Sequence, residues 1–160
     1  MKNNESLVAR RNAAVARGVA MAQPIYIERA ENALLWDADG NRYVDFAGGI
    51  AVLNTGHRHP RVLEAVRAQL EKVTHTCFQI TGYEPYVALC ERLNKLAPGA
   101  GANKTLLMTT GAEAIENAIK IARVHTGRSA VISFAGSFHG RTMMALALTG
   151  KVEPYKAGFG

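Results

Sequence analysis

The sequence has little of what marks the specialised classes of protein. Its 160 residues include only 2 cysteines, 5 prolines and 15 glycines, and 48% of them are hydrophobic. So few cysteines exclude a disulfide scaffold, and this proline and glycine content excludes a collagen-like or low-complexity chain. No apolar run approaches the roughly 20 residues that cross a bilayer. These absences leave an ordinary globular composition.

The charge balance is basic but scattered. There are 19 Lys and Arg residues against 13 Asp and Glu, a formal charge of +6. Net charge is therefore the only feature of the sequence that favours nucleic-acid binding. We expect neither a nucleic-acid partner nor a membrane partner. Cys77 and Cys90 lie in apolar periodic segments, which favours reduced thiols and a cytoplasmic location.

The pattern of apolar residues predicts an α/β protein. Asp39-Gly40 indicates a turn between two strand-like runs, 33–37 and 42–46. Helical spacing predicts helices over 5–19, 60–73, 84–96 and 111–125. Segments 104–110 and 130–134 are predicted to be strands on either side of the last helix. A strand, helix and strand of this size favour a right-handed parallel crossover.

The segment Thr109–Ala114 is the first candidate site. Gly111 permits a sharp turn into the helix, whose free N–H groups and dipole attract a phosphate. An ordinary strand-to-helix turn also needs a small residue here, so both interpretations stay open. The glycine patterns of ATPase and nicotinamide sites are absent. Within this helix, Glu116 and Lys120 have the spacing of a favourable pair.

The segment Phe134–Thr142 is the second candidate site. Phe138 could stack on a planar ring, and Arg141 could bind a carboxylate through two hydrogen bonds. The alternative is a glycine-rich loop with a core phenylalanine and a surface arginine. His57 and His59 have no cluster of Cys or carboxylates at metal spacing. We expect no metal site and a structural role for these histidines before the helix that begins at Pro60.

Three segments carry a family resemblance: 45–57, 109–114 and 137–142. Together they resemble the class III pyridoxal-phosphate (PLP) aminotransferases. Residues 75–79 and 148–155 narrow the resemblance to the bacterial members that act on 4-aminobutyrate. The similarity runs along nearly the whole sequence but corresponds to the N-terminal part of a family chain.

The resemblance implies roles for four residues at the cofactor. The backbone N–H groups of Gly111 and Ala112 match those that bind the cofactor phosphate. Phe138 matches the aromatic residue stacked on the pyridine ring, and His139 lies next to the cofactor. Many relatives have Ser at position 112 and Tyr at position 138, so this chain lacks two of their hydroxyl groups.

Three further residues match the substrate site of the family. Arg141 corresponds to the residue that pairs with the substrate carboxylate, and Ile50 and Gln79 correspond to residues that line the pocket. The implied reaction moves the amino group of 4-aminobutyrate to 2-oxoglutarate, giving succinate semialdehyde and glutamate. The alternatives are another ω-amino acid (5-aminovalerate, acetylornithine or ornithine) and a truncated binding module without catalysis.

The resemblance also implies an architecture, the fold type I of PLP transferases. Residues 1–58 are expected to form the arm, helix and hairpin of a small domain. Residues 59–160 are expected to begin a large PLP-binding domain with a mostly parallel sheet. Family active sites form between two subunits, so a homodimer is expected. The lysine and aspartate that hold the cofactor are expected beyond Gly160, which leaves no catalytic residue within these 160 residues and predicts that they are inactive alone.

Overall fold

The computed structural model describes residues 2–159, and the chain divides into two compact units after Thr76. The domain boundary expected between residues 58 and 59 concerns the whole family fold and stays a prediction. Each unit is described by itself below.

The first unit begins with helix α1 (Asn4–Ala14), which is shorter than the predicted 5–19. Asn3 accepts a hydrogen bond from the N–H of Ser6, and the Ser6 side chain accepts one from the N–H of Asn3. This reciprocal pair satisfies two of the free N–H groups at the helix start.

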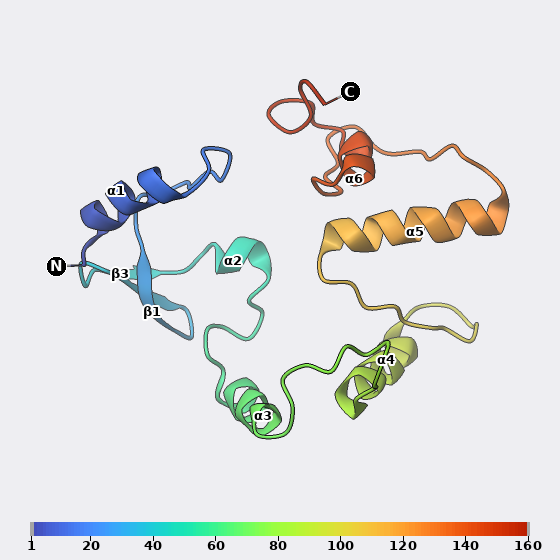
Figure 1. Ribbon diagram of the computed structural model, residues 1–160, viewed down its shortest axis with the longest axis horizontal. Coiled ribbons are helices and arrows are strands. Elements are labelled where there is room, and N and C mark those ends of the chain that lie inside the picture. The colour runs from blue at the N-terminus through green and yellow to red at the C-terminus, as the bar shows by residue number, and fades with distance from the viewer. Residues whose placement is uncertain (1, 160) are drawn as a thin grey trace. The chain divides into compact units, whose positions relative to one another are not determined.

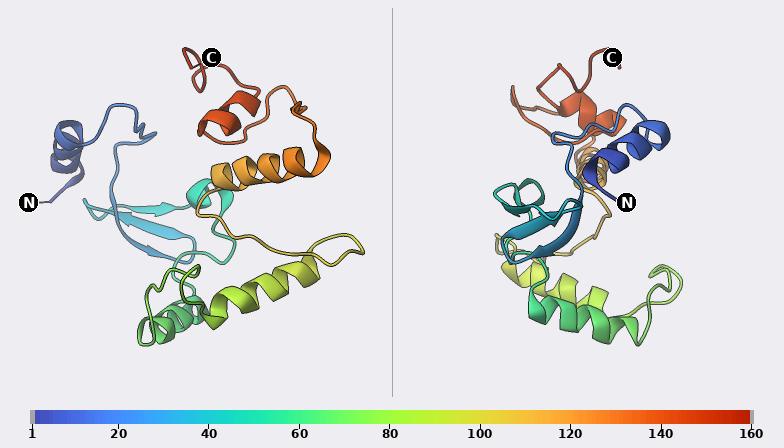
Figure 2. Two further views of the ribbon diagram at one scale, coloured as in Figure 1. Left: turned by 45° about the vertical axis from the view of Figure 1, so that its right-hand side comes forward. Right: turned by 90° about the vertical axis from the view of Figure 1, so that its left-hand side faces the viewer.

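Three antiparallel strands follow, in the order β1–β2–β3 (Figures 1 and 2). The predicted hairpin is confirmed as β2 (Leu34–Asp37) and β3 (Arg42–Val44). Gly40 turns the chain between them with a φ of 85°. Strand β1 (Ile27–Glu31) was not predicted, because its sequence does not alternate between polar and apolar residues.

Asp37 holds these elements together. Its side chain is 3% exposed and accepts hydrogen bonds from Tyr43 Oη (2.7 Å), Asn41 Nδ2 (3.1 Å) and Asn4 Nδ2 (2.9 Å). Burial raises the pKa of Asp37, but these hydrogen bonds outweigh it and hold the pKa well below its ordinary value. The carboxylate thereby ties α1 to the hairpin.

Two helices complete the first unit: the short α2 (Gly48–Ala51) and α3 (Pro60–Leu70). Pro60 occupies the start of α3, where its missing N–H costs nothing. His57, which lies between α2 and α3, exchanges backbone hydrogen bonds of 2.9 and 2.8 Å with Asn32, the residue after β1. This bridge fixes the segment after α2 to the end of β1.

The second unit contains α4 (Glu84–Leu96), α5 (Gly111–Thr126) and α6 (Met143–Leu148). The helices predicted over 84–96 and 111–125 are confirmed, and Gly127 ends α5 in the left-handed conformation. Helices α5 and α6 lie against each other (Figure 1). The buried apolar residues of the described chain are on these two helices: Ile119, Ala145 and Leu146.

The prediction of two parallel strands is wrong for the described residues. Neither 104–110 nor 130–134 is a strand in residues 2–159. Segment 104–107 is instead tied to α4, where Thr105 donates to Asn94 Oδ1 (2.7 Å). Ile132 and Phe134 are 92% and 81% exposed. A strand needs a hydrogen-bonded neighbour, and parallel strands need cover on both faces. Within residues 2–159, neither segment has a hydrogen-bonded strand as its neighbour.

Across residues 2–159, no helix has both the length and the apolar character needed to cross a membrane. The same residues contain no group of three or more His, Cys, Asp or Glu side chains placed to hold a metal ion. The candidate site described next lies at the start of α5.

Candidate functional site

The candidate site is built around the start of α5. Thr110 accepts a hydrogen bond from the N–H of Glu113 (3.1 Å), and Glu113 accepts one from the N–H of Thr110 (2.9 Å). Within the described residues, the N–H groups of Gly111 and Ala112 have no partner. These two donors lie at the positive end of a 16-residue helix, where the sequence predicts a phosphate site.

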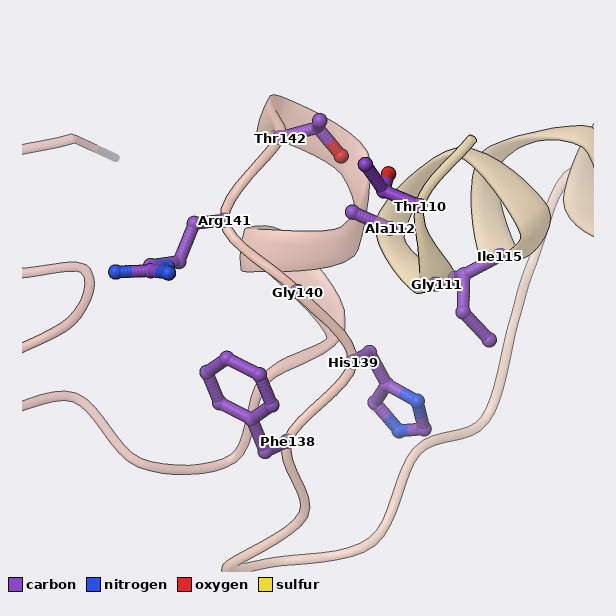
Figure 3. A pocket seen from close by; sticks show the side chains of 9 residues that line it. All are labelled: Thr110, Gly111, Ala112, Ile115, Phe138, His139, Gly140, Arg141 and Thr142. Atoms are coloured by element: carbon purple, nitrogen blue, oxygen red, sulfur yellow. The ribbon is translucent and has the colours of Figure 1, made fainter. Parts of the chain in front are cut away.

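The loop before α6 lies across this helix start. A hollow of about 670 Å³ opens between them, and Figure 3 shows the side chains around it. Its lining residues are Thr110, Gly111, Ala112, Ile115, Phe138, His139, Gly140, Arg141 and Thr142. The structure therefore brings together five of the seven residues predicted for cofactor and substrate: Gly111, Ala112, Phe138, His139 and Arg141.

The loop presents three chemically different side chains. Phe138 is 56% exposed, and its ring packs edge-on against Tyr155 at 5.2 Å between centroids. The partly exposed His139 ring lies on the side of the helix start, while Arg141 extends to the other side of the loop (Figure 3). In the described residues Arg141 is exposed and has no ion pair. The loop that lies across the start of α5 thus carries an aromatic ring and a guanidinium that has no ion pair within residues 2–159.

Gly140 lets the loop approach α5 closely. It is buried with a φ of 131°, and a Cβ atom there would lie 2.6 Å from Ala112 Cβ. Atoms at that separation overlap, and L side chains rarely adopt this backbone conformation. Position 140 therefore requires glycine.

Two polar side chains fix the loop, and the sequence pattern assigned neither to it. Glu116 Oε1 accepts from Thr142 Oγ1 (2.6 Å) and from the N–H of Met144 (3.0 Å). The buried Thr149 hydroxyl accepts from the N–H of His139 (3.1 Å).

Glu116 was expected to pair with Lys120, and the described residues contain no ion pair between them. The spacing of Glu116 and Lys120 on the helix surface gives no information about the contact of Glu116 with Thr142, which is 26 residues away.

The other two predicted substrate residues lie elsewhere. Gln79 is exposed in the same compact unit but is not among the residues that line the hollow. Ile50 belongs to the first unit, where it is 91% exposed with a φ of 65°. Their substrate-binding roles stay predictions.

His57 is paired with Asp45, which precedes α2. Its Nε2 lies 2.6 Å from Asp45 Oδ2, and Asp45 Oδ1 accepts from the N–H groups of Ala47 (3.1 Å) and Gly48 (2.9 Å). The His57 hydrogen bond and the Gly48 N–H lower the pKa of Asp45. His57 therefore contacts the turn that starts α2, and the role expected for His57 and His59 before the helix at Pro60 stays a prediction.

Comparison with known proteins connects the site to a family. A sequence model described as aminotransferase class-III matches residues 14–160. The chain is 62% identical over 159 residues to the 5-aminovalerate aminotransferase DavT of Pseudomonas putida, covering 99% of this chain and 37% of that protein. It is 59% identical over 160 residues to the 4-aminobutyrate aminotransferase GabT of Escherichia coli, covering 100% of this chain and 38% of that protein.

Solved structures agree with this assignment. An (S)-enantioselective omega-transaminase from Thermomicrobium roseum matches with a TM-score of 0.85 and 32% identity, over 100% of this chain and 38% of that one. An ornithine aminotransferase from Toxoplasma gondii matches with a TM-score of 0.82 and 32% identity, over 99% and 38%. The predicted fold class is confirmed: the chain has the partial α/β fold of these enzymes.

The chain spans 37–38% of the length of the two bacterial relatives. Because the family model covers residues 14–160, the family assignment applies to nearly all of the sequence. This chain belongs to the class III aminotransferase family.

Proposed function

We propose that this chain is the N-terminal part of a cytoplasmic, homodimeric PLP-dependent aminotransferase. It would transfer the amino group of 4-aminobutyrate to 2-oxoglutarate, giving succinate semialdehyde and glutamate. The observation that carries the proposal is the hollow at the start of α5, which is lined by an aromatic ring, by two N–H groups without a partner in residues 2–159 and by an arginine without an ion pair there. Free cysteines at positions 77 and 90 support a reducing compartment.

The residues present fit the cofactor. The N–H groups of Gly111 and Ala112, unpartnered within residues 2–159, suit a phosphate, and Phe138 offers a half-exposed ring for stacking on a pyridine. Ala112 adds no hydroxyl, so the backbone alone supplies the hydrogen bonds there. When bound, PLP supplies the electron sink that lets the amino group move between two carbon skeletons.

The chain's own residues would position the substrate. Arg141 is the one exposed cation among the residues that line the hollow, and its planar guanidinium matches a carboxylate. It would hold the carboxylate remote from the amino group, so that the amino carbon lies over the cofactor. His139, on the helix side of the loop, would contact the cofactor and shield it from water. Ile50 and Gln79 would line the rest of the substrate pocket.

The choice of ω-amino acid has a specific rival. The Pseudomonas putida relative, a 5-aminovalerate aminotransferase, is 62% identical, and the Escherichia coli 4-aminobutyrate enzyme is 59% identical. The two substrates differ by one methylene group, and Arg141 suits both. Turnover of 4-aminobutyrate, 5-aminovalerate and acetylornithine by the full-length protein decides between them. A preference for either of the latter two would refute the proposed substrate.

The first test is the intact mass of the protein from its native source, before and after borohydride reduction. A chain much heavier than 17.2 kDa that retains one reduced cofactor supports the proposal. A 17.2 kDa chain without an adduct contradicts it and favours a binding module without catalysis.

Arg141→Ala tests the carboxylate site in the full-length enzyme. We expect the KM for 4-aminobutyrate to rise by about ten- to a hundredfold, since a charge-assisted pair is lost, with a smaller change in kcat. Arg128→Ala is the matched control, because Arg128 is an exposed arginine in the same unit with no ion pair in residues 2–159. An unchanged KM in Arg141→Ala would remove Arg141 from this role.

A further inference from the structure

Glu116 connects the helix that begins the anion site to the helix that follows Arg141. Its Oε1 accepts three hydrogen bonds from the start of α6: Thr142 Oγ1 (2.6 Å), Met144 N–H (3.0 Å) and Ala145 N–H (3.3 Å). The side chain comes from the second turn of α5 and is half-buried. One oxygen atom thus joins two elements that are far apart in the sequence.

The arrangement differs from ordinary capping of a helix. A threonine before a helix commonly accepts hydrogen bonds from the first N–H groups of that helix. Thr142 is in that position, yet its side chain makes no capping bond and its hydroxyl donates to Glu116 instead. The carboxylate of Glu116 therefore replaces the local cap and makes the position of α6 depend on α5.

The opposite side of Arg141 is fixed by Thr149, the residue that follows α6. The Thr149 hydroxyl, fully buried, accepts from the N–H of His139 (3.1 Å) and lies 3.0 Å from the carbonyl oxygen of Ala145, to which it donates. Gly140, between His139 and Arg141, lies directly on Ala112. The backbone is therefore held just before Arg141 by Thr149 and just after it by Glu116.

We propose that Glu116 is a positioning residue for Arg141. It holds the Arg141 loop at a fixed place relative to the N–H groups of Gly111 and Ala112, and so sets the distance between the carboxylate site and the phosphate site. This inference rests on the proposed function, which gives both sites their ligands. Arg141 itself makes no ion pair within residues 2–159, so its backbone anchors are what place it.

The charge of Glu116 is present over the whole neutral range. The hydrogen bond from Thr142 lowers the pKa of Glu116, although partial burial opposes this, and the Met144 and Ala145 N–H groups add to the lowering. Hydrogen bonds to an ionised acceptor are about twice as strong as neutral ones. Glu116→Gln keeps the shape and one acceptor oxygen but removes the charge, whereas Glu116→Ala removes all three bonds.

The test compares these two variants in the full-length protein. We expect the KM for 4-aminobutyrate to rise about tenfold in Glu116→Ala and by less in Glu116→Gln, with kcat within about twofold of wild type, because displacing a substrate-positioning group weakens binding. Turnover of a primary amine without a carboxylate should not change. Glu91→Gln, on the exposed side of α4, is the matched control.

A second readout does not need activity. Hydrogen exchange of the Met144 and Ala145 amides should be at least about tenfold faster in Glu116→Ala, while the amides of α5 exchange as in wild type. Unchanged exchange at these amides would refute the idea that Glu116 holds the start of α6, whether or not the protein is a transaminase. Faster exchange with an unchanged KM, or an equal loss for substrates with and without a carboxylate, would refute the positioning role. A wild-type protein without transaminase activity would refute the proposed function instead.

Discussion

Replacing Gly140 with alanine should destabilise the protein and distort the site at the same time. The new Cβ would lie 2.6 Å from Ala112 Cβ, 3.0 Å from Ala112 Cα and 3.1 Å from Ala145 Cβ. All three are atoms of packed helices, so no flexible side chain can move away. The loop must therefore shift away from α5, or α6 must separate from it.

The expected loss has two parts. A residue with a side chain held at positive φ costs about 1–2 kcal/mol, and Gly140 has a φ of 131°. Forcing one extra methyl group into packed surroundings costs about 1–3 kcal/mol more. Together these predict that Gly140→Ala lowers the free energy of unfolding by about 2–5 kcal/mol, a large share of the about 5–15 kcal/mol typical of a folded domain.

Urea denaturation of the full-length protein measures this loss from the midpoint and slope of the transition. Gly136→Ala is the matched control: Gly136 has a φ of 77°, but no atom lies within 4 Å of the place that its new methyl group would take. It should show only the backbone cost, about 1–2 kcal/mol. Equal losses in the two variants would refute the packing argument.

A second substitution separates the contact from the backbone strain. Ala112→Gly removes the atom at 2.6 Å but leaves the contacts with Ala112 Cα at 3.0 Å and Ala145 Cβ at 3.1 Å. In a double-mutant cycle, Gly140→Ala should therefore cost about 1 kcal/mol less in the Ala112→Gly background. Strictly additive effects would mean that the Gly140 contact with Ala112 is not what resists the methyl group.

Two other substitutions test single polar contacts. Thr149→Val leaves the partly buried N–H of His139 without its acceptor, which should cost about 1–3 kcal/mol in urea denaturation. Thr149→Ser keeps the hydroxyl and should recover most of this, and equal losses in both would assign the effect to packing. Asp45→Asn weakens the bond to His57, and its effect should depend on pH. Because the pKa of Asp45 is lowered in the folded state, its ionised form stabilises the protein above about pH 4, and this contribution is lost as the pH falls further. The difference in Tm between wild type and Asp45→Asn should therefore be largest near pH 7 and shrink below pH 4, and a difference that is constant with pH would contradict the argument.

Local patterns predicted the elements whose causes are local. Helix α4 follows from apolar residues at helical spacing, and the hairpin follows from Asp39-Gly40 between strand-like runs. The start of α5 is set by the Thr110 and Glu113 pair, three residues apart. In each case the interacting groups lie within one or two turns of each other, so a short window of sequence contains the whole reason.

Elements that depend on distant partners were missed or wrong. Segments 104–110 and 130–134 have strand-like composition, but composition does not supply the neighbouring strand that a ladder requires. Helix α6 has six residues, too few for a periodic pattern. Glu116 has the spacing of a surface pair with Lys120, yet its partners are 26 to 29 residues away. The motifs predicted five residues that the structure brings around one hollow, but not the contacts that hold them there.

Under the proposed function, those contacts would bear on substrate choice. The curated relatives named above act, according to their names, on 5-aminovalerate and on 4-aminobutyrate, and they are 62% and 59% identical to this chain. One methylene group in a pocket changes specificity by about 1–3 kcal/mol, or about 10- to 200-fold. An arginine that binds a carboxylate can make this distinction only if its distance from the cofactor is fixed to less than the length of that methylene group. The Arg141 side chain is exposed and makes no ion pair within residues 2–159, so a fixed distance of this kind would have to come from its backbone. Glu116, Thr149 and Gly140 are the groups that hold that backbone.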